Sequence, residues 1–303
     1  MSQVKLPSWR TGTTRDAIES FLDASEMLPV EERMAVFDLD GTVWCEQPQP
    51  VGLEFLIAEL QAAVAERPRL GDRPEYRAVL DGDRKAIGQL GAVNVQLALN
   101  ELHTGITPEA FERRARAFID RWRHPLWMVP CSQLRYRPML ELIAELRARL
   151  FSVYLATGSG SEFVRVISRS FYGVEPEGVL GAQVGYELDR SDGTPRLRRT
   201  WELVGDANEG AAKIATVQRL AGRRPILAAG NAGGDWEMLE YTAASDGPSL
   251  ALLIEHDDDA REYAYGTAVS TPRGAEPIVT AARRAGFAIV SMREDWSAIF
   301  AAT

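Results

Sequence analysis

Residues 34–42 read Met-Ala-Val-Phe-Asp-Leu-Asp-Gly-Thr, and this stretch decides the fold. Its four apolar residues predict a short buried strand of a parallel sheet. Gly41 ends the strand because glycine lets the chain turn sharply. Asp38 and Asp40 are therefore expected at the carboxyl end of the strand, where open α/β sheets place their ligands. Neighbouring carboxylates repel unless a cation or a shared proton relieves them. Taken alone, however, Asp-Gly after a strand is also an ordinary turn.

The pattern of a strand, a loop and a helix recurs after residue 138. Such repeated units predict an α/β fold with a doubly wound parallel sheet. Alternation around Ser191-Asp192-Gly193 predicts a β-ribbon over residues 179–202. The remaining strands are expected at 151–156, 225–229, 249–254 and 287–291.

Residues 46–129 carry little strand signal and read as helices. Apolar residues at helical spacing occur from Leu53 to Val64, and a second helix is expected at 84–102. Thr107-Pro108 is a cap followed by a first-turn proline, which predicts the start of a third helix. We therefore expect residues 46–129 to form a helical cap domain, inserted into an α/β core made of 1–45 and 130–303.

The composition of the 303-residue chain, 46% hydrophobic and 25% charged, is that of an ordinary globular protein. The net charge of −9 argues against a nucleic-acid or anionic membrane surface as partner. No stretch is apolar enough for a membrane helix, and residues 1–10 lack the apolar region of a signal peptide. Two cysteines cannot form a disulfide framework. We expect a cytoplasmic enzyme, monomeric or homodimeric.

Polar residues follow three of the expected strands. Because parallel strands end at one edge of a sheet, these residues are expected to converge. Thr157 and its following backbone N–H groups can face an anion at a helix N-terminus or simply cap that helix. Lys213 taken alone would be a solvated helix lysine. The three converging pairs are Asp38 and Asp40, Thr157 and Ser159, and Asn231 and Asp235.

Residues 34 to about 255 resemble the haloacid dehalogenase superfamily, in its phosphatase branch. The place of the expected helical insertion is similar to that of the phosphoserine-phosphatase-like subgroup. The resemblance is carried by four motifs, Asp38-Leu39-Asp40-Gly41-Thr42, Thr157 at a strand end, Lys213 on a helix, and Gly230-Asn231-Ala232-Gly233-Gly234-Asp235.

This resemblance implies a Mg²⁺-dependent phosphatase that hydrolyses a small phosphorylated metabolite through an aspartyl phosphate. Asp38 would be the nucleophile, and Asp40 would protonate the leaving oxygen and then activate water. Thr157 and Lys213 would hold phosphate oxygens. The further implied roles are substrate binding by Gly158, Ser159 and Glu46, and Mg²⁺ binding by Asp38, Asp40, Asn231 and Asp235.

The chain departs from the family pattern at Asn231, where an aspartate usually binds the metal. An amide oxygen brings no charge, so we expect a weaker metal site or a catalytically silent binding protein. A phosphotransferase and a carbon–halogen hydrolase are rivals, although halide release needs no proton from Asp40. The subgroup's substrate-sensing glutamate is replaced by Gln47, with Glu46 beside it. Glu46 either faces the substrate or is a solvated loop residue.

Overall fold

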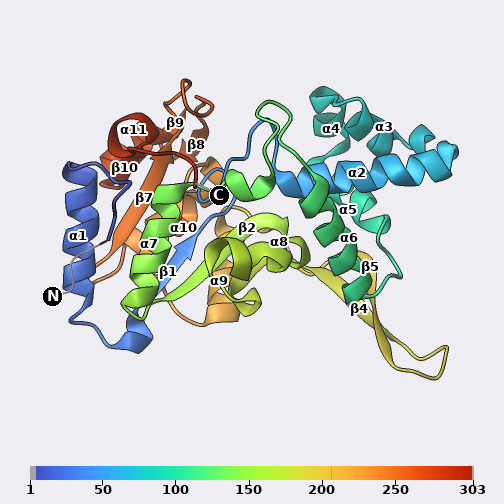
Figure 1. Cartoon of the computed structure of the whole chain (residues 1–303), viewed down its shortest axis with the longest axis horizontal. Coiled ribbons are helices and arrows are strands. Elements are labelled where there is room, and N and C mark those ends of the chain that lie inside the picture. The colour runs from blue at the N-terminus through green and yellow to red at the C-terminus, as the bar shows by residue number, and fades with distance from the viewer. Residues whose placement is uncertain (1–4, 206, 302–303) are drawn as a thin grey trace.

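The computed structural model describes residues 5–205 and 207–301, and a six-stranded sheet lies at its centre (Figure 1). All neighbouring strands in this sheet run parallel. The doubly wound α/β class expected from the sequence is thereby confirmed. The strand order is β10 (Ala288–Ser291), β7 (Leu250–Glu255), β6 (Leu227–Gly230), β1 (Met34–Phe37), β2 (Ser152–Gly160) and β3 (Val179–Ala182).

Two layers of helices cover the sheet because both faces of its strands are apolar. In β1, Ala35 and Phe37 point into one core, whereas Met34 and Val36 point into the other. The first core is closed by α1 (Thr13–Ser25), α7 (Arg137–Ala148) and α8 (Ser161–Ile167). The second is closed by α9 (Ala211–Ala221), α10 (Trp236–Ala243) and α11 (Ile278–Ala285).

A group of helices between β1 and α7, here called the helical insertion (residues 51–121), lies beyond the end of β1 (Figure 1). It has a small apolar cluster of its own, which includes Leu60, Tyr76 and Leu99. The helix expected at 84–102 is two helices, because Gly91 has a φ of 85° and breaks the helical path. The helices are α2 (Val51–Glu66), α3 (Pro74–Leu80), α4 (Arg84–Leu90), α5 (Ala92–Glu101) and α6 (Pro108–Arg121).

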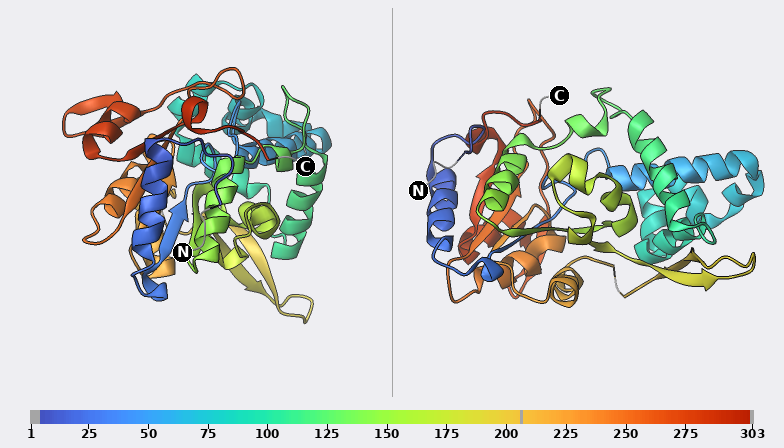
Figure 2. Two further views of the ribbon diagram at one scale, coloured as in Figure 1. Left: turned by 60° about the vertical axis from the view of Figure 1, so that its left-hand side comes forward. Right: turned by 60° about the horizontal axis from the view of Figure 1, so that its bottom comes forward.

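The ribbon expected at 179–202 is divided between two sheets. Its first four residues form β3, which pairs in parallel with β2 as the edge strand of the central sheet. The rest is an antiparallel hairpin of β4 (Val184–Asp189) and β5 (Arg196–Leu203). Backbone hydrogen bonds join Arg199 of this hairpin to Gly105 (2.8 Å) and Ile106 (2.9 Å). Figure 2 shows the hairpin running alongside the helical insertion.

The C-terminal part of the chain adds a hairpin that the sequence did not predict. It consists of β8 (Ala268–Thr271) and β9 (Gly274–Pro277) and precedes α11. The last short helix is α12 (Met292–Asp295). Across the described ranges, none of the helices combines the length and the apolar character needed to cross a bilayer.

Candidate active site

The end of β1 places two aspartates at the carboxyl edge of the sheet, as expected. The backbone N–H of Asp38 still donates to Ala229 of the neighbouring strand (2.9 Å), so this residue is held by the sheet. The chain then turns at Gly41, whose φ is 81°. A Cβ at Gly41 would collide with Asn231 and Glu46, so the close approach of these two side chains also requires glycine.

Lys213 joins the ends of two strands. Its ammonium donates to Asp38 (Nζ–Oδ1 2.7 Å) and to Asp235 (Nζ–Oδ1 2.6 Å). Only 1% of the lysine is exposed, which excludes the solvated helix lysine that its position alone would suggest. Burial by itself lowers the pKa of Lys213, but the charges of Asp235 and Asp38 outweigh burial and raise it well above its ordinary value. The lysine is therefore a fixed cation.

The carboxylate of Asp38 is buried, and its two oxygens have different neighbours. Oδ1 accepts from Lys213, and Oδ2 lies 3.1 Å from the hydroxyl of Thr42. Burial and the charge of Asp235 raise the pKa of Asp38 despite the opposing effect of Lys213. A cation bound beside Asp38 would favour the ionised carboxylate.

Asn231 uses both ends of its amide. Its Oδ1 lies 3.2 Å from the hydroxyl of Thr42, on the side of Asp38. Its Nδ2 donates to Glu46 (Nδ2–Oε1 2.8 Å), which also accepts from the hydroxyl of Tyr265 (2.6 Å). Glu46 is therefore held in the site by two donors, which excludes the solvated loop position. Burial raises the pKa of Glu46.

Asp235 is surrounded by donors on both oxygens. Oδ1 accepts from Lys213, and Oδ2 accepts from the backbone N–H groups of Asn231 (2.9 Å) and Ala232 (3.0 Å). These contacts fix the loop after β6 and hold the lysine in place. In this arrangement Asp235 positions Lys213 and Asn231.

The carboxylate of Asp40 is held between the end of β2 and the loop that follows β1. Its Oδ2 accepts from the hydroxyl of Ser159 and its Oδ1 from the indole of Trp44, each over 2.8 Å. Burial raises the pKa of Asp40. A carboxyl group that retains its proton more readily than usual is suited to donate that proton to a leaving oxygen.

The end of β2 contributes Thr157, Gly158 and Ser159. The hydroxyl of Thr157 is buried and accepts from the backbone N–H of Ser159 (2.9 Å), so it shapes the loop. Gly158 and Ser159 line the cavity of the site, whereas Thr157 lies behind them. The role of Thr157 toward phosphate stays a prediction.

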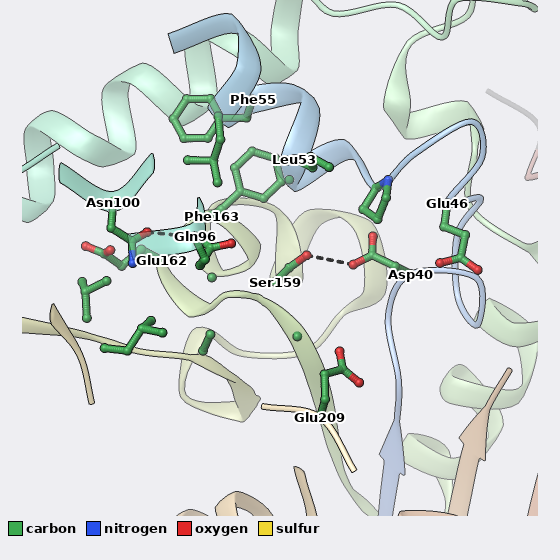
Figure 3. A pocket seen from close by; sticks show the side chains of 18 of the residues that line it. Asp40, Glu46, Leu53, Phe55, Gln96, Asn100, Ser159, Glu162, Phe163 and Glu209 are labelled. Carbon is green, nitrogen blue, oxygen red and sulfur yellow. Dashed lines mark hydrogen bonds between the residues drawn. The ribbon is translucent and has the colours of Figure 1, made fainter. Parts of the chain in front are cut away.

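These groups lie at one end of a cavity of about 310 Å³, shown in Figure 3. Six acidic and two basic side chains line it. An entering phosphate would therefore meet an excess of negative charge, which a cation can offset. The charged side chains are Asp38, Asp40, Glu46, Glu162, Glu209, Asp235, Arg199 and Lys213.

The donor set fits a hard cation through Asp38 and Asn231, because their oxygens both lie beside the hydroxyl of Thr42. Asp235 is occupied by other donors, and Asp40 is turned toward Ser159 and Trp44. Among the residues that the structure describes, no three His, Cys, Asp or Glu side chains are grouped for metal binding. A Mg²⁺ ion here would draw further oxygens from backbone, water or substrate phosphate, as this ion commonly does.

Sequence reasoning missed Glu209, which precedes α9. Its carboxylate lies 3.7 Å from the ammonium of Lys213. It also covers Gly158 and Gly234, where a Cβ would collide with it. No local motif marks Glu209, since its place depends on two glycines from other loops.

The comparisons with known proteins agree with this architecture. A family model described as haloacid dehalogenase-like hydrolase matches residues 35–249. No curated protein matches the chain in sequence. A structure described as a protein with unknown function from Bordetella pertussis Tohama I is 19% identical, with a TM-score of 0.54; 86% of this chain and 98% of that chain are covered.

Two further solved structures are also similar. A conserved functionally unknown protein from Anaerococcus prevotii is 15% identical, with a TM-score of 0.56 and coverage of 83% of this chain and 87% of that one. A phosphoserine phosphohydrolase-like protein from Francisella tularensis is 17% identical, with a TM-score of 0.38 and coverage of 73% and 87%. At these identities, the two structures with TM-scores above 0.5 bear on the fold alone. Because the family model spans most of the sequence and the strand-end residues converge as the four motifs require, the chain belongs to the haloacid dehalogenase-like hydrolases.

Proposed function

We propose that this protein is a Mg²⁺-dependent phosphatase that hydrolyses a small phosphomonoester through an aspartyl phosphate on Asp38. The observation that carries the proposal is the contact of Lys213 with Asp38 and Asp235 in the wall of the cavity. A buried carboxylate beside a fixed cation suits a nucleophile for a phosphoryl group, because the cation offsets charge that builds up on the phosphate oxygens.

In the first step, a carboxylate oxygen of Asp38 attacks phosphorus and the bond from phosphorus to the ester oxygen breaks. Asp40 gives its proton to the departing oxygen, for which its raised pKa suits it. The hydroxyl of Ser159 and the indole of Trp44 hold Asp40 in one orientation.

In the second step, the now ionised Asp40 takes a proton from water, and the water oxygen attacks phosphorus. The bond between phosphorus and Asp38 breaks, which releases inorganic phosphate and restores the aspartate. Lys213, Gly158 and Ser159 face the space where the phosphate oxygens would lie.

Mg²⁺ would be held by Asp38 and Asn231, and it would supply charge neutralisation for the carboxylates and the phosphate. Asn231 brings no charge of its own, but Glu46 stands directly behind its amide. Glu46 thus supplies a negative charge like the one that an aspartate would carry at position 231, but from one side chain further away from the Mg²⁺ site.

We propose that the helical insertion acts as a cap that shields the cavity from water. Leu53 and Phe55 of α2 and Phe111 of α6 line the cavity, so the insertion supplies much of its wall. The expected division into a core of 1–45 and 130–303 and a cap of 46–129 stays a prediction, as do the cytoplasmic location and the monomeric or homodimeric state.

The test is hydrolysis of 4-nitrophenyl phosphate with and without Mg²⁺, combined with acid quenching to trap a phosphorylated protein. We expect Mg²⁺-dependent turnover and a phosphoenzyme that is absent from Asp38→Asn, because an amide cannot form the acyl phosphate. Turnover by a folded Asp38→Asn variant would overturn the assignment of the nucleophile. Phosphate binding by the parent without turnover of any ester would instead identify a binding protein.

A further inference from the structure

The cavity has a second polar end, away from the catalytic groups. Figure 3 shows Gln96, Asn100 and Glu162 together on the side of the cavity opposite Asp40. Apolar side chains that also line the cavity, Leu53 and Phe163 among them, lie between the two ends in this view. A ligand whose phosphate lies at Asp38 would therefore extend its alcohol portion along an apolar wall toward these polar residues.

Gln96 and Asn100 lie one turn apart on α5 and share one hydrogen bond. Nε2 of Gln96 donates to Oδ1 of Asn100 over 3.1 Å. Only 5% of Asn100 is exposed, and its Nδ2 group is buried. This group has no hydrogen-bond partner among the described residues. A buried donor without a partner is costly, and a ligand that accepts from it would remove that cost.

Among the described residues, the shared bond leaves one whole NH₂ group, Nδ2 of Asn100, and one carbonyl oxygen, Oε1 of Gln96, without a hydrogen-bond partner. Turning both amides over leaves the same combination, because each amide then gives the opposite atom to the shared bond. The group that complements such a pair is itself amide-like, with an acceptor next to a donor. A carboxylate could meet the donor but would place its second oxygen against the acceptor.

The charges near this end also disfavour an anionic ligand. Glu162 accepts from Arg199 (2.7 Å) and from the hydroxyl of Tyr186 (2.8 Å). The guanidinium of Arg199 stacks over Phe111 at 4.3 Å, so this cation is already engaged by a carboxylate and an aromatic ring. Acidic side chains outnumber basic ones six to two along the whole cavity.

We propose that the Gln96–Asn100 pair binds the leaving group of the substrate, and that this group is uncharged and ends in an amide-like edge with one acceptor and one donor. This inference rests on the proposed phosphatase function, because it takes the phosphate to lie at Asp38. It assigns specificity to residues of α5, outside the four motifs.

The probes are phosphate monoesters of ω-hydroxyalkanamides with two to six methylene groups, each paired with the carboxylate of equal length. We expect one length at which kcat/KM for the amide exceeds that for the carboxylate by about tenfold or more, because sites built to bond a polar group reject an analogue that leaves their groups unpaired. Asn100→Leu removes the free donor without adding a charge that would itself repel the carboxylate, and it should lower this preference about tenfold.

The matched control is Asn94→Leu on the same helix, where the asparagine is exposed and donates to the backbone carbonyl of Leu90 at the end of α4. This control should leave the preference for the amide unchanged. Asn100→Ala serves as a second variant if Asn100→Leu does not fold. The proposal is overturned if amide and carboxylate esters are used equally at every length, or if the folded Asn100 variants retain the full preference.

Failure of the proposed function gives a different result. Dissociation constants for the same esters are measured by calorimetry in Asp38→Asn, alone and combined with the Asn100 variants. Tighter binding of the amides that depends on Asn100, without turnover of any ester by the parent, would refute the phosphatase and retain the subsite. Turnover by the parent without amide preference in rate or binding would refute the subsite alone.

Discussion

Asn231 and Glu46 are joined by a hydrogen bond of 2.8 Å in which the amide nitrogen donates to the carboxylate. The resemblance to the family leads us to expect an aspartate at position 231, but the amide found there and its glutamate partner are a matched pair. An aspartate at 231 would place a second carboxylate oxygen against Glu46, and among the described residues the hydroxyl of Tyr265 would be the one donor left to it. Buried carboxylates in contact repel each other strongly.

We predict that Asn231→Asp lowers the free energy of unfolding by about 1–3 kcal/mol, because a donor is replaced by a like charge. Adding Glu46→Gln restores an amide opposite the new carboxylate and should recover most of this loss. Urea unfolding of the parent, both single variants and the double variant forms a cycle that isolates the interaction. Additive effects of the two substitutions would contradict the pairing.

The role of Asp40 as a proton donor predicts a dependence on the leaving group. Asp40→Asn should lower kcat/KM for an alkyl phosphate about 10²–10⁴-fold, since an alkoxide leaves poorly without a proton. The loss should be at least about tenfold smaller for 4-nitrophenyl phosphate, whose phenolate leaves readily. Because kcat/KM reports the steps up to the phosphoenzyme, equal losses for both esters would assign Asp40 a different role.

Glu209 predicts an effect on phosphate affinity. Its carboxylate lies beside Lys213 and covers Gly158, where a phosphate would enter. Glu209→Gln should strengthen competitive inhibition by inorganic phosphate about 3–10-fold, because it removes a like charge close to the anion. Glu202→Gln, at an exposed position of β5 outside the cavity wall, is the control with the same change of charge. An equal effect of both variants would show that the change in phosphate affinity comes from the net charge of the protein and not from the position of Glu209.

His103 predicts a pH dependence of stability. Burial lowers its pKa, and it stacks on Phe55 in the cavity wall. The unfolded state binds a proton near the ordinary pKa of about 6.5, whereas the folded state binds one only at lower pH. The contribution of His103 to the free energy of unfolding is therefore fully present above about pH 6.5. It falls as the pH decreases, by at most about 1.4 kcal/mol at pH 5.5.

The measurement is urea unfolding of the parent and His103→Leu at about pH 7.5 and 5.5. The variant should lose less stability between the two pH values than the parent does. Glu59, whose carboxylate lies 3.1 Å from the ring of His103, keeps its contact with Arg114 (2.9 Å) in the variant. Identical losses would show that His103 titrates alike in both states.

The convergence of the strand-end residues was predictable from the sequence, because it depends on topology. Asp38 and Asp235 follow apolar strands, and the ends of parallel strands meet at one edge. Lys213 then reaches both carboxylates from α9, which packs against β2 and β3. The buried hydrophobic faces fix these positions without help from distant loops.

The distal end was not predictable, because it depends on packing between segments far apart in the chain. Asn100 reads as an ordinary helix residue, and Arg199 as an exposed residue of a ribbon. Their place in one cavity follows from the pairing of β5 with the loop before α6, which no local pattern encodes. The break at Gly91 was missed for a related reason, since apolar residues continue at helical spacing on both sides of it.

The β4–β5 hairpin has a consequence for modular exchange between relatives. It continues from the edge strand of the core sheet, yet it supplies Arg199 and Leu203 to the cavity wall and pairs with the segment before α6. Transplanting residues 51–121 alone into another hydrolase of this fold would leave behind the part of the wall that contains Arg199 and Leu203. Specificity should therefore transfer only as a graft of two pieces, and natural divergence of substrate choice requires coordinated changes in both.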